Sequence, residues 1–277
     1  MEVLRPTTIS EALAARAARP EALPIAGGTD VMVELNFDKA RPPAILDLTA
    51  VPELATIERE NGAIRIGAGV PYTRVIAELE QILPALAQAS RTVGSPPIRN
   101  RATIGGNLGT ASPAGDAHPP LLAAGATVET ASAHTTRSIA IDEFFTGPGQ
   151  SALQPDELVT AITVPIADHR EQFAKIGTRN AMVIAVCSFA VRIDRERGRV
   201  GTGIGSAGPT PLRATEAEAF VEGLMAADEP IDDAARKRFG ELVAQAARPI
   251  DDHRGTADYR RHALGVLAAR TLAWACA

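Results

Sequence analysis

The chain has 277 residues, which is enough for two domains that each bury a core. Its composition, 45% hydrophobic and 22% charged, is typical of globular proteins and not of disordered or fibrous ones. A formal net charge of −5 argues against nucleic acid as the main partner, because proteins that bind nucleic acid usually carry a basic face.

Targeting and metal-binding signals are missing from the sequence. The N-terminus lacks the basic region and apolar run of a signal peptide, and the longest apolar run, residues 181–191, is too short to span a membrane. The two cysteines, Cys187 and Cys276, cannot build a cluster, and the five histidines never fall at ligand spacing. We expect a cytoplasmic protein with no membrane span and no metal or iron–sulfur site of its own.

Short helices and strands alternate in the N-terminal part of the chain. Residues 10–16 predict a capped helix that ends before Pro20. A strand at 23–26 leads into a glycine pair, and a helix or turn at 30–35 follows it directly. The further elements expected here are strands at 44–48 and 63–69, helices at 71–79 and 84–93, and a loop over 98–107.

The sequence predicts a domain boundary near residues 168–172. Before it we expect a short helix at 119–124 and strands at 127–130 and 158–164. After it we expect strands at 173–176, 181–193 and 200–206, a turn at 196–198, and helices at 215–225, 232–247 and 257–275. The mixed order indicates an α+β protein with domains 1–167, divided into subdomains at about 1–55 and 56–167, and 168–277.

Two glycine pairs are the most informative motifs: AGGTD at residues 26–30 and TIGGN at residues 103–107. Glycine lets the backbone approach a ligand without a Cβ in the way, and successive N–H groups can then bind a phosphate. Two such loops, one on each side of a pyrophosphate, favour a dinucleotide. A third motif, GIGSAG at residues 203–208, fits a dinucleotide-binding string, but the prolines at 209 and 211 argue against the helix that it requires.

Polar residues around the loops supply further candidate contacts. Asp30 is expected to cap the helix that follows, since its carboxylate cannot bind phosphate favourably. Thr103 and Asn107 supply side-chain hydrogen bonds, and Thr110 extends the polar surface. Asp116 is placed either to accept from a ribose or ribityl hydroxyl or to cap the helix near residue 119.

AGGTD and TIGGN, with SPAGD at 112–116 and DYRRHALGVL at 258–267, resemble the medium, FAD-binding subunit of molybdenum hydroxylases. That family includes the flavoproteins of bacterial xanthine dehydrogenase and aerobic carbon monoxide dehydrogenase. The resemblance covers essentially the whole chain, with the motifs in the right order. It implies a two-part FAD-binding domain of the vanillyl-alcohol-oxidase-like (PCMH) type, followed by a smaller α+β domain of the carbon monoxide dehydrogenase flavoprotein type.

The resemblance also implies a set of cofactor contacts. Both glycine loops would hold the FAD pyrophosphate, and Lys175 matches a lysine close to the flavin, where a cation would stabilise the anionic reduced ring. The alternative for Lys175 is a strand lysine that extends to solvent. The expected cofactor-binding residues are Ile25, Ala26, Gly27, Gly28, Thr29, Asp30, Val31, Ile98, Ala102, Thr103, Gly106, Asn107, Thr110, Asp116, Leu158, Val159 and Lys175.

No catalytic base or nucleophile is evident in the sequence, which favours an electron-transfer subunit. The resemblance implies non-covalent FAD here, with the molybdenum cofactor on a large partner chain and [2Fe–2S] clusters on a small one, in a dimer of heterotrimers. Electrons would pass from the clusters through FAD to NAD or another acceptor, in a xanthine dehydrogenase-like role. The alternative is a free-standing FAD-dependent oxidoreductase that acts directly on an organic substrate.

Overall fold

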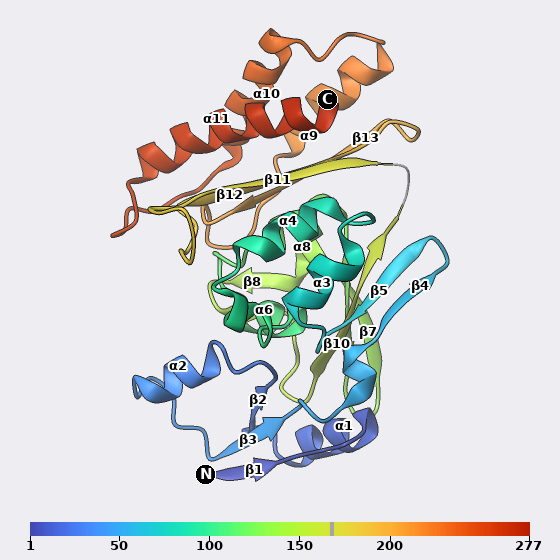
Figure 1. Cartoon of the computed structure of the whole chain (residues 1–277), viewed down its shortest axis with the longest axis vertical. Coiled ribbons are helices and arrows are strands. Elements are labelled where there is room, and N and C mark those ends of the chain that lie inside the picture. The colour runs from blue at the N-terminus through green and yellow to red at the C-terminus, as the bar shows by residue number, and fades with distance from the viewer. Residues whose placement is uncertain (167–168) are drawn as a thin grey trace.

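Three larger sheets follow one another along the long axis of the molecule in this computed structural model, which describes residues 1–166 and 169–277 (Figure 1). The strands β8 (Phe145–Gly147) and β9 (Gln150–Ser151) form a separate two-stranded sheet. The two chain ends lie towards opposite ends of that axis. The predicted domain boundary, between residues 167 and 168, lies outside the described residues.

The first sheet is parallel, in the order β1-β3-β2. Thr8 caps its first helix by accepting a hydrogen bond from the Glu11 N–H, so the predicted capped helix is confirmed, with an earlier start. The elements are β1 (Glu2–Leu4), α1 (Ile9–Ala18), β2 (Leu23–Ile25), α2 (Val31–Asn36) and β3 (Ala44–Asp47). Every residue of α2 is partly or fully exposed, including Met32 and Val33.

The second sheet is antiparallel, in the order β4-β5-β10-β6-β7, and one apolar core joins it to the first sheet and to α1 and α3. The strands and the 3-10 helix are η1 (Pro52–Ala55), β4 (Ile57–Glu60), β5 (Ala63–Gly67), β6 (Thr127–Ala131), β7 (Thr136–Ala140), β8 (Phe145–Gly147), β9 (Gln150–Ser151) and β10 (Leu158–Pro165). The helices are α3 (Tyr72–Leu79), α4 (Pro84–Thr92), α5 (Pro96–Arg99), α6 (Ile104–Thr110), α7 (His118–Ala123) and α8 (Ile141–Phe144).

The third sheet is antiparallel and is covered on both faces. It comprises β11 (Arg170–Ile176), β12 (Cys187–Asp194) and β13 (Arg199–Gly205), and α9 (Thr215–Ala226), α10 (Asp233–Ala246) and α11 (Ala257–Cys276) follow it. On β12, Phe189 and Val191 face the core shared with α10 and α11, whereas Ala190 faces α4 and α7. The N-terminal part of the chain therefore supplies one of the two covers of the C-terminal sheet (Figure 1).

Two sequence expectations for these elements were wrong. The strand expected over 181–193 begins only at Cys187, since Met182 takes a left-handed φ of 52° and Ile184 is half exposed. The TIGGN segment, expected as a loop, is the cap and first turns of α6. The short elements β1, β4, β7 and α5 were not predicted, because each is too brief to show a periodic apolar pattern.

Candidate functional site

The first glycine segment joins β2 to α2 and lies directly against the chain before α6. A Cβ at Gly27 would stand 1.9 Å from the Arg101 carbonyl oxygen, so only glycine permits this approach. Gly28 has a φ of 76°, in the left-handed region that glycine tolerates. Gly27 therefore serves the packing of one segment on another, while Gly28 serves the turn.

Five successive backbone N–H groups of this segment, residues 27–31, have no acceptor among the described residues. Their carbonyl groups are used normally, because Gly28 accepts from Met32 and Asp30 accepts from Val33 at the start of α2. A run of free amides where a turn enters a helix is a site for an anion.

Asp30 ties the first segment to α6 instead of capping α2. Its backbone stands at the cap position of α2, but its side chain makes no cap hydrogen bond. The Asp30 Oδ2 atom instead accepts from the Thr110 Oγ1 atom at 3.0 Å. The expected capping role of Asp30 is therefore wrong, because a hydroxyl on α6 lies within reach.

The second glycine segment uses its amides within the protein. Thr103 caps α6 by accepting from the Gly106 N–H at 3.0 Å, and the Gly105 N–H donates to the Ala68 carbonyl. A Cβ at Gly105 would lie 2.4 Å from the Ala68 Cβ, whereas one at Gly106 would meet only Thr103 Oγ1, at 3.0 Å. Gly105 is therefore buried by packing and does not open the backbone to a ligand, whereas Gly106 is exposed and its contact with a ligand stays a prediction.

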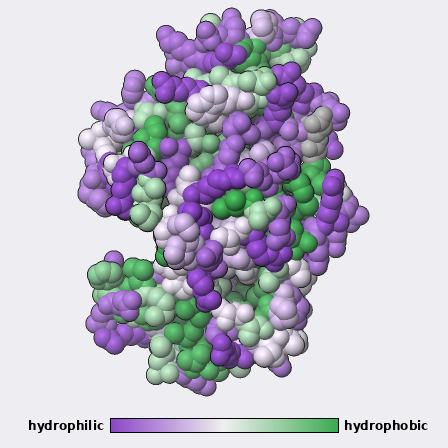
Figure 2. Space-filling view, viewed as in Figure 1, coloured by the Kyte–Doolittle hydropathy of each residue, from purple (hydrophilic) through white to green (hydrophobic). Residues whose placement is uncertain are grey.

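The surface is hollowed into a notch between the lobe that carries α2 and the lobe above it (Figure 2). The helices α2 and α6 lie on this side of the molecule (Figure 1). Since Asp30 and Thr110 join the two elements, both glycine segments meet at this notch.

A buried ion pair joins the SPAGD segment to the third sheet. Lys175 Nζ, on β11, lies 2.6 Å from Asp116 Oδ2 and 3.2 Å from the Thr92 carbonyl oxygen. Burial raises the pKa of Asp116, and the Lys175 charge opposes that rise. Within the described chain, Asp116 Oδ1 is buried without a hydrogen-bond partner.

Two alternatives from the sequence are thereby resolved. Asp116 does not cap the helix near residue 119, because α7 begins at His118 without a side-chain cap. Lys175 does not extend to solvent, since only 7% of its side chain is exposed.

The buried polar atoms that lack a partner in the part of the chain that the structure describes also include Asn107 Oδ1, Tyr72 Oη and His118 Nδ1. The His118 Nε2 atom lies 3.2 Å from the Asn107 carbonyl oxygen, and burial lowers the His118 pKa to about 4, so the ring is neutral at pH 7. Burial, and next the charges of Asp116 and Asp30, raise the pKa of Tyr72. Sequence reasoning missed Tyr72, because a tyrosine at a helix start carries no site signal.

The remaining expected residues divide between surface and core. Ile98, on α5, is 38% exposed, and the Ala102 carbonyl accepts from the Tyr72 N–H at 3.1 Å. Leu158 and Val159 lie on β10, paired with β6, and are 3% and 8% exposed. The other members of the set flank the first turn: Ile25 ends β2, Ala26 and Thr29 are half-buried, and Val31 begins α2.

The GIGSAG segment behaves as the sequence indicates. The strand β13 ends at Gly205, and the next helix, α9, begins only at Thr215. A Cβ at Gly203 would stand 2.0 Å from the Pro119 carbonyl oxygen, so this glycine serves the packing of β13 on α7.

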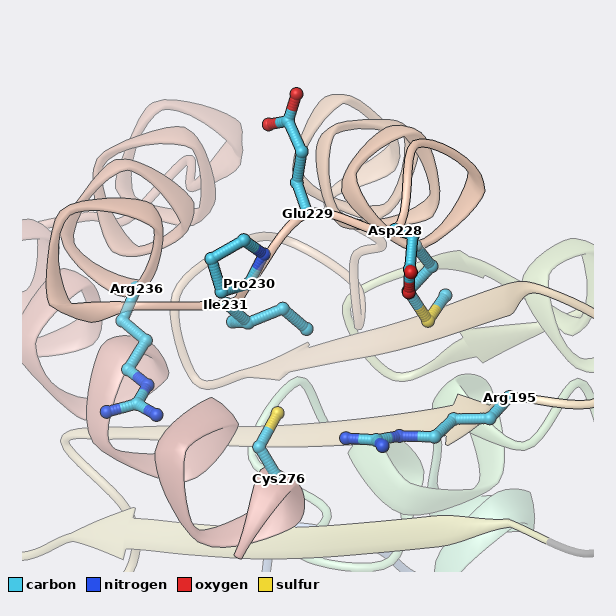
Figure 3. A pocket seen from close by; sticks show the side chains of 8 residues that line it. Arg195, Asp228, Glu229, Pro230, Ile231, Arg236 and Cys276 are labelled. Carbon is cyan, nitrogen blue, oxygen red and sulfur yellow. The ribbon is translucent and has the colours of Figure 1, made fainter.

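A hollow of about 480 Å³ in the C-terminal part lies between Arg195, Arg236 and Cys276 (Figure 3). None of the expected cofactor contacts lines it. Among the described residues, no cluster of His, Cys, Asp and Glu is placed to hold a metal ion. No helix in residues 1–166 or 169–277 is both long and apolar enough to cross a membrane.

Comparison with known families agrees with this fold. Residues 1–167 match the FAD binding domain in molybdopterin dehydrogenase, and residues 172–275 match the CO dehydrogenase flavoprotein C-terminal domain. The putative xanthine dehydrogenase FAD-binding subunit of Escherichia coli is 30% identical over 99% of this chain and 95% of its own. The glyceraldehyde dehydrogenase medium chain of Sulfolobus acidocaldarius is 32% identical over 95% and 94%.

Solved structures show the same architecture. Reconstituted CO dehydrogenase from Oligotropha carboxidovorans matches with a TM-score of 0.93 and 28% identity, over 99% of this chain and 97% of the matched one. Quinoline 2-oxidoreductase from Pseudomonas putida matches with a TM-score of 0.91 and 25% identity, over 99% and 96%. The chain belongs to the family of FAD-binding subunits of molybdenum hydroxylases, and it is an oxidoreductase flavoprotein. The predicted family, fold class and FAD cofactor are thus confirmed.

Proposed function

We propose that this chain holds one non-covalent FAD in the notch between α2 and α6 and relays electrons through it. The observation that carries the proposal is the run of five free amides at residues 27–31, which suits a pyrophosphate. The buried, unpartnered Asp116 Oδ1 and Asn107 Oδ1 atoms fit the same cofactor, because both accept hydrogen bonds and the ribityl chain offers hydroxyl donors.

Each expected residue has a part in this arrangement. The segment from Ile25 to Val31 binds the pyrophosphate, with exposed Gly106 admitting it on the α6 side. Asp116 accepts from the ribityl chain. The remaining expected contacts surround these groups: Ile98, Ala102, Thr103, Asn107, Thr110, Leu158, Val159 and Lys175.

When bound, FAD supplies two-electron and one-electron redox chemistry. Lys175 contributes a positive charge held in a buried position. Its ammonium group donates hydrogen bonds to Asp116 Oδ2 and to the Thr92 carbonyl oxygen, which uses two of its three N–H bonds. The third is free to donate to the flavin. Because the Lys175 charge is offset by Asp116, we expect the pair to favour the anionic reduced ring less than an unpaired lysine would.

The wider assembly that we propose is supported by the relatives, one of which is named as a medium chain. We assign residues 1–167 to FAD binding and 168–277 to the second domain. The chain would receive electrons from [2Fe–2S] clusters on a small subunit, supplied by a large molybdenum subunit in a dimer of heterotrimers. It would pass them to NAD or another acceptor. A xanthine dehydrogenase-like role is supported by the Escherichia coli relative.

Three measurements test this function. Acid precipitation should release FAD into the supernatant, and flavin retained in the pellet would contradict the non-covalent site.

The chain co-expressed with its large and small partners should co-purify with molybdenum, iron and FAD. Isolated, it should bind FAD but oxidise no organic substrate of the complex. Turnover of such a substrate by the isolated chain would favour the free-standing flavoenzyme.

A further inference from the structure

A groove of about 590 Å³ runs between α10 and α11, on the outer side of the C-terminal part. Its floor is made of small residues at helical i, i+4 spacing, Gly240 and Ala244 on α10 and Gly265 and Ala269 on α11. A Cβ at Gly240 would stand 2.3 Å from the Gly265 carbonyl oxygen, so the glycines let these helices touch. A shallow, small-residue floor between two helices accepts the side-chain ridge of a third.

The rim of the groove is basic, although the whole chain carries a net charge of −5. Four Arg and Lys side chains line it against two carboxylates, those of Asp233 and Glu241. Both carboxylates are already engaged, Asp233 with Arg236 and Glu241 with Arg238. Lys237 and Arg270, by contrast, have no ion-pair partner among the residues that the structure describes. The groove therefore offers two uncompensated cations.

The outer stripe of α11 adds the side chains that interfaces favour. Val266, Arg270 and Trp274 follow one another at i, i+4 spacing, and Val266 and Trp274 are 40% and 54% exposed. Aromatic residues and arginine are enriched where protein surfaces meet. Trp274 is the one tryptophan of the sequence. A partner that covers the exposed Trp274 ring would remove its apolar surface from water, which is favourable.

We propose that an acidic amphipathic helix of a partner chain docks in this groove. This docking proposal rests on the proposed function of the chain as one subunit of a complex. Its apolar side lies on the floor of small residues, and its carboxylates lie beside Lys237 and Arg270. A second copy of this chain fits worse, because a twofold contact of the groove with itself would place two rims of net positive charge against each other. The groove lies on α10 and α11, so its occupant leaves the notch between α2 and α6 uncovered.

The test compares the wild-type chain with K237E/R270E in assembly with the large and small subunits. The control is R195E, whose exposed arginine lies on the hairpin between β12 and β13, outside this groove. Dissociation constants are measured at 50 and 500 mM NaCl, together with FAD content and thermal midpoint. We expect K237E/R270E to bind the partners at least roughly tenfold more weakly at 50 mM NaCl, with a smaller difference at 500 mM. Its FAD content and midpoint should match those of R195E.

The outcomes separate the two proposals. If the wild-type chain assembles and K237E/R270E assembles equally tightly, the groove is not the docking site, while the proposed function stands. If the wild-type chain binds FAD but no partner chain, the subunit function fails and the docking proposal falls with it. If the wild-type chain forms a dimer alone that K237E/R270E loses, the occupant is a second copy and the proposal of an acidic partner is overturned.

Discussion

Individual glycines of the two glycine pairs have different structural roles, although their sequence contexts are similar. Gly27 and Gly105 each allow one stretch of backbone to lie against another, Arg101 in the first case and Ala68 in the second. Gly106 meets only the side chain of its own helix cap. The same residue type thus builds the scaffold at two positions and leaves open space at a third.

Gly106 is therefore the position at which a side chain tests cofactor binding without disturbing the fold. We expect G106V to retain less than a tenth of the wild-type FAD, because the valine methyl groups would occupy the surface that must meet phosphate. The matched control is G109V, on the same helix, where a Cβ meets nothing within 4 Å. Valine favours a helix slightly more than glycine does at both positions, so the change in helix propensity is similar in the two variants and a difference in flavin absorbance isolates the contact. Equal occupancy in the two would remove α6 from the phosphate site.

His118 gives stability a pH dependence. Its folded pKa of about 4 lies below the ordinary value of 6.5, so the unfolded chain binds more protons between these two pH values. The free energy of unfolding therefore includes the full contribution of the neutral ring above about pH 6.5. This contribution, at most about 3 kcal/mol, is lost as the pH falls towards 4. Urea unfolding of H118Q should show a flatter pH profile over this window than the wild type. Parallel profiles would show that His118 does not titrate as its burial requires.

Among the elements, α4 is the one that joins the two halves of the chain. Its first turn donates the Ala85 N–H to the buried Glu171 carboxylate on β11 at 3.0 Å, and Gln88 accepts from the Phe173 N–H at 2.8 Å. Glu171 also lies 3.9 Å from the buried Arg192 guanidinium on β12. Helix α4 is thus fixed to the sheet by polar contacts as well as by apolar packing.

Removing the Glu171 charge should weaken this joint strongly. E171Q removes one of the two carboxylates that stabilise the buried Arg192 charge, the other being Asp194, and removing a partner from a buried pair costs about 3 kcal/mol or more. The control is E78Q, which removes an exposed i, i+4 partner of Arg74 and should cost less than about 1 kcal/mol. Free energies of unfolding from urea titrations provide the comparison. Equal losses in the two variants would mean that the buried Glu171 charge contributes no more to stability than the exposed Glu78 charge.

For the whole molecule, the shared third sheet predicts cooperative unfolding. Trp274 lies on α11, so its fluorescence reports the C-terminal part, whereas far-UV circular dichroism reports the entire chain. Because α4 and α7 cover one face of the C-terminal sheet, we expect both signals to change at the same urea concentration. Separate transitions would show that the two halves unfold independently.

Much of this arrangement is readable in the sequence, and the reason for the rest is physical. The long elements, such as α10, α11 and β10, can be predicted from the periodicity of their apolar residues and from flanking caps or prolines. The TIGGN helix was missed because two glycines in a first turn resemble a loop. The Lys175–Asp116 contact joins residues 59 positions apart, one on β11 and one in the turn before α7, which no local pattern encodes. Tyr72 is a site candidate only through its buried, unpartnered hydroxyl, a tertiary property.

The position of Lys175 has a consequence for chimeric proteins. This lysine belongs to β11, yet its ammonium group lies against Asp116 and Thr92 from the first half of the chain. Exchanging the second half with that of a relative would therefore replace more than a structural support. It would also replace the group that faces Asp116, so the charge balance of the proposed flavin site would come from both parents.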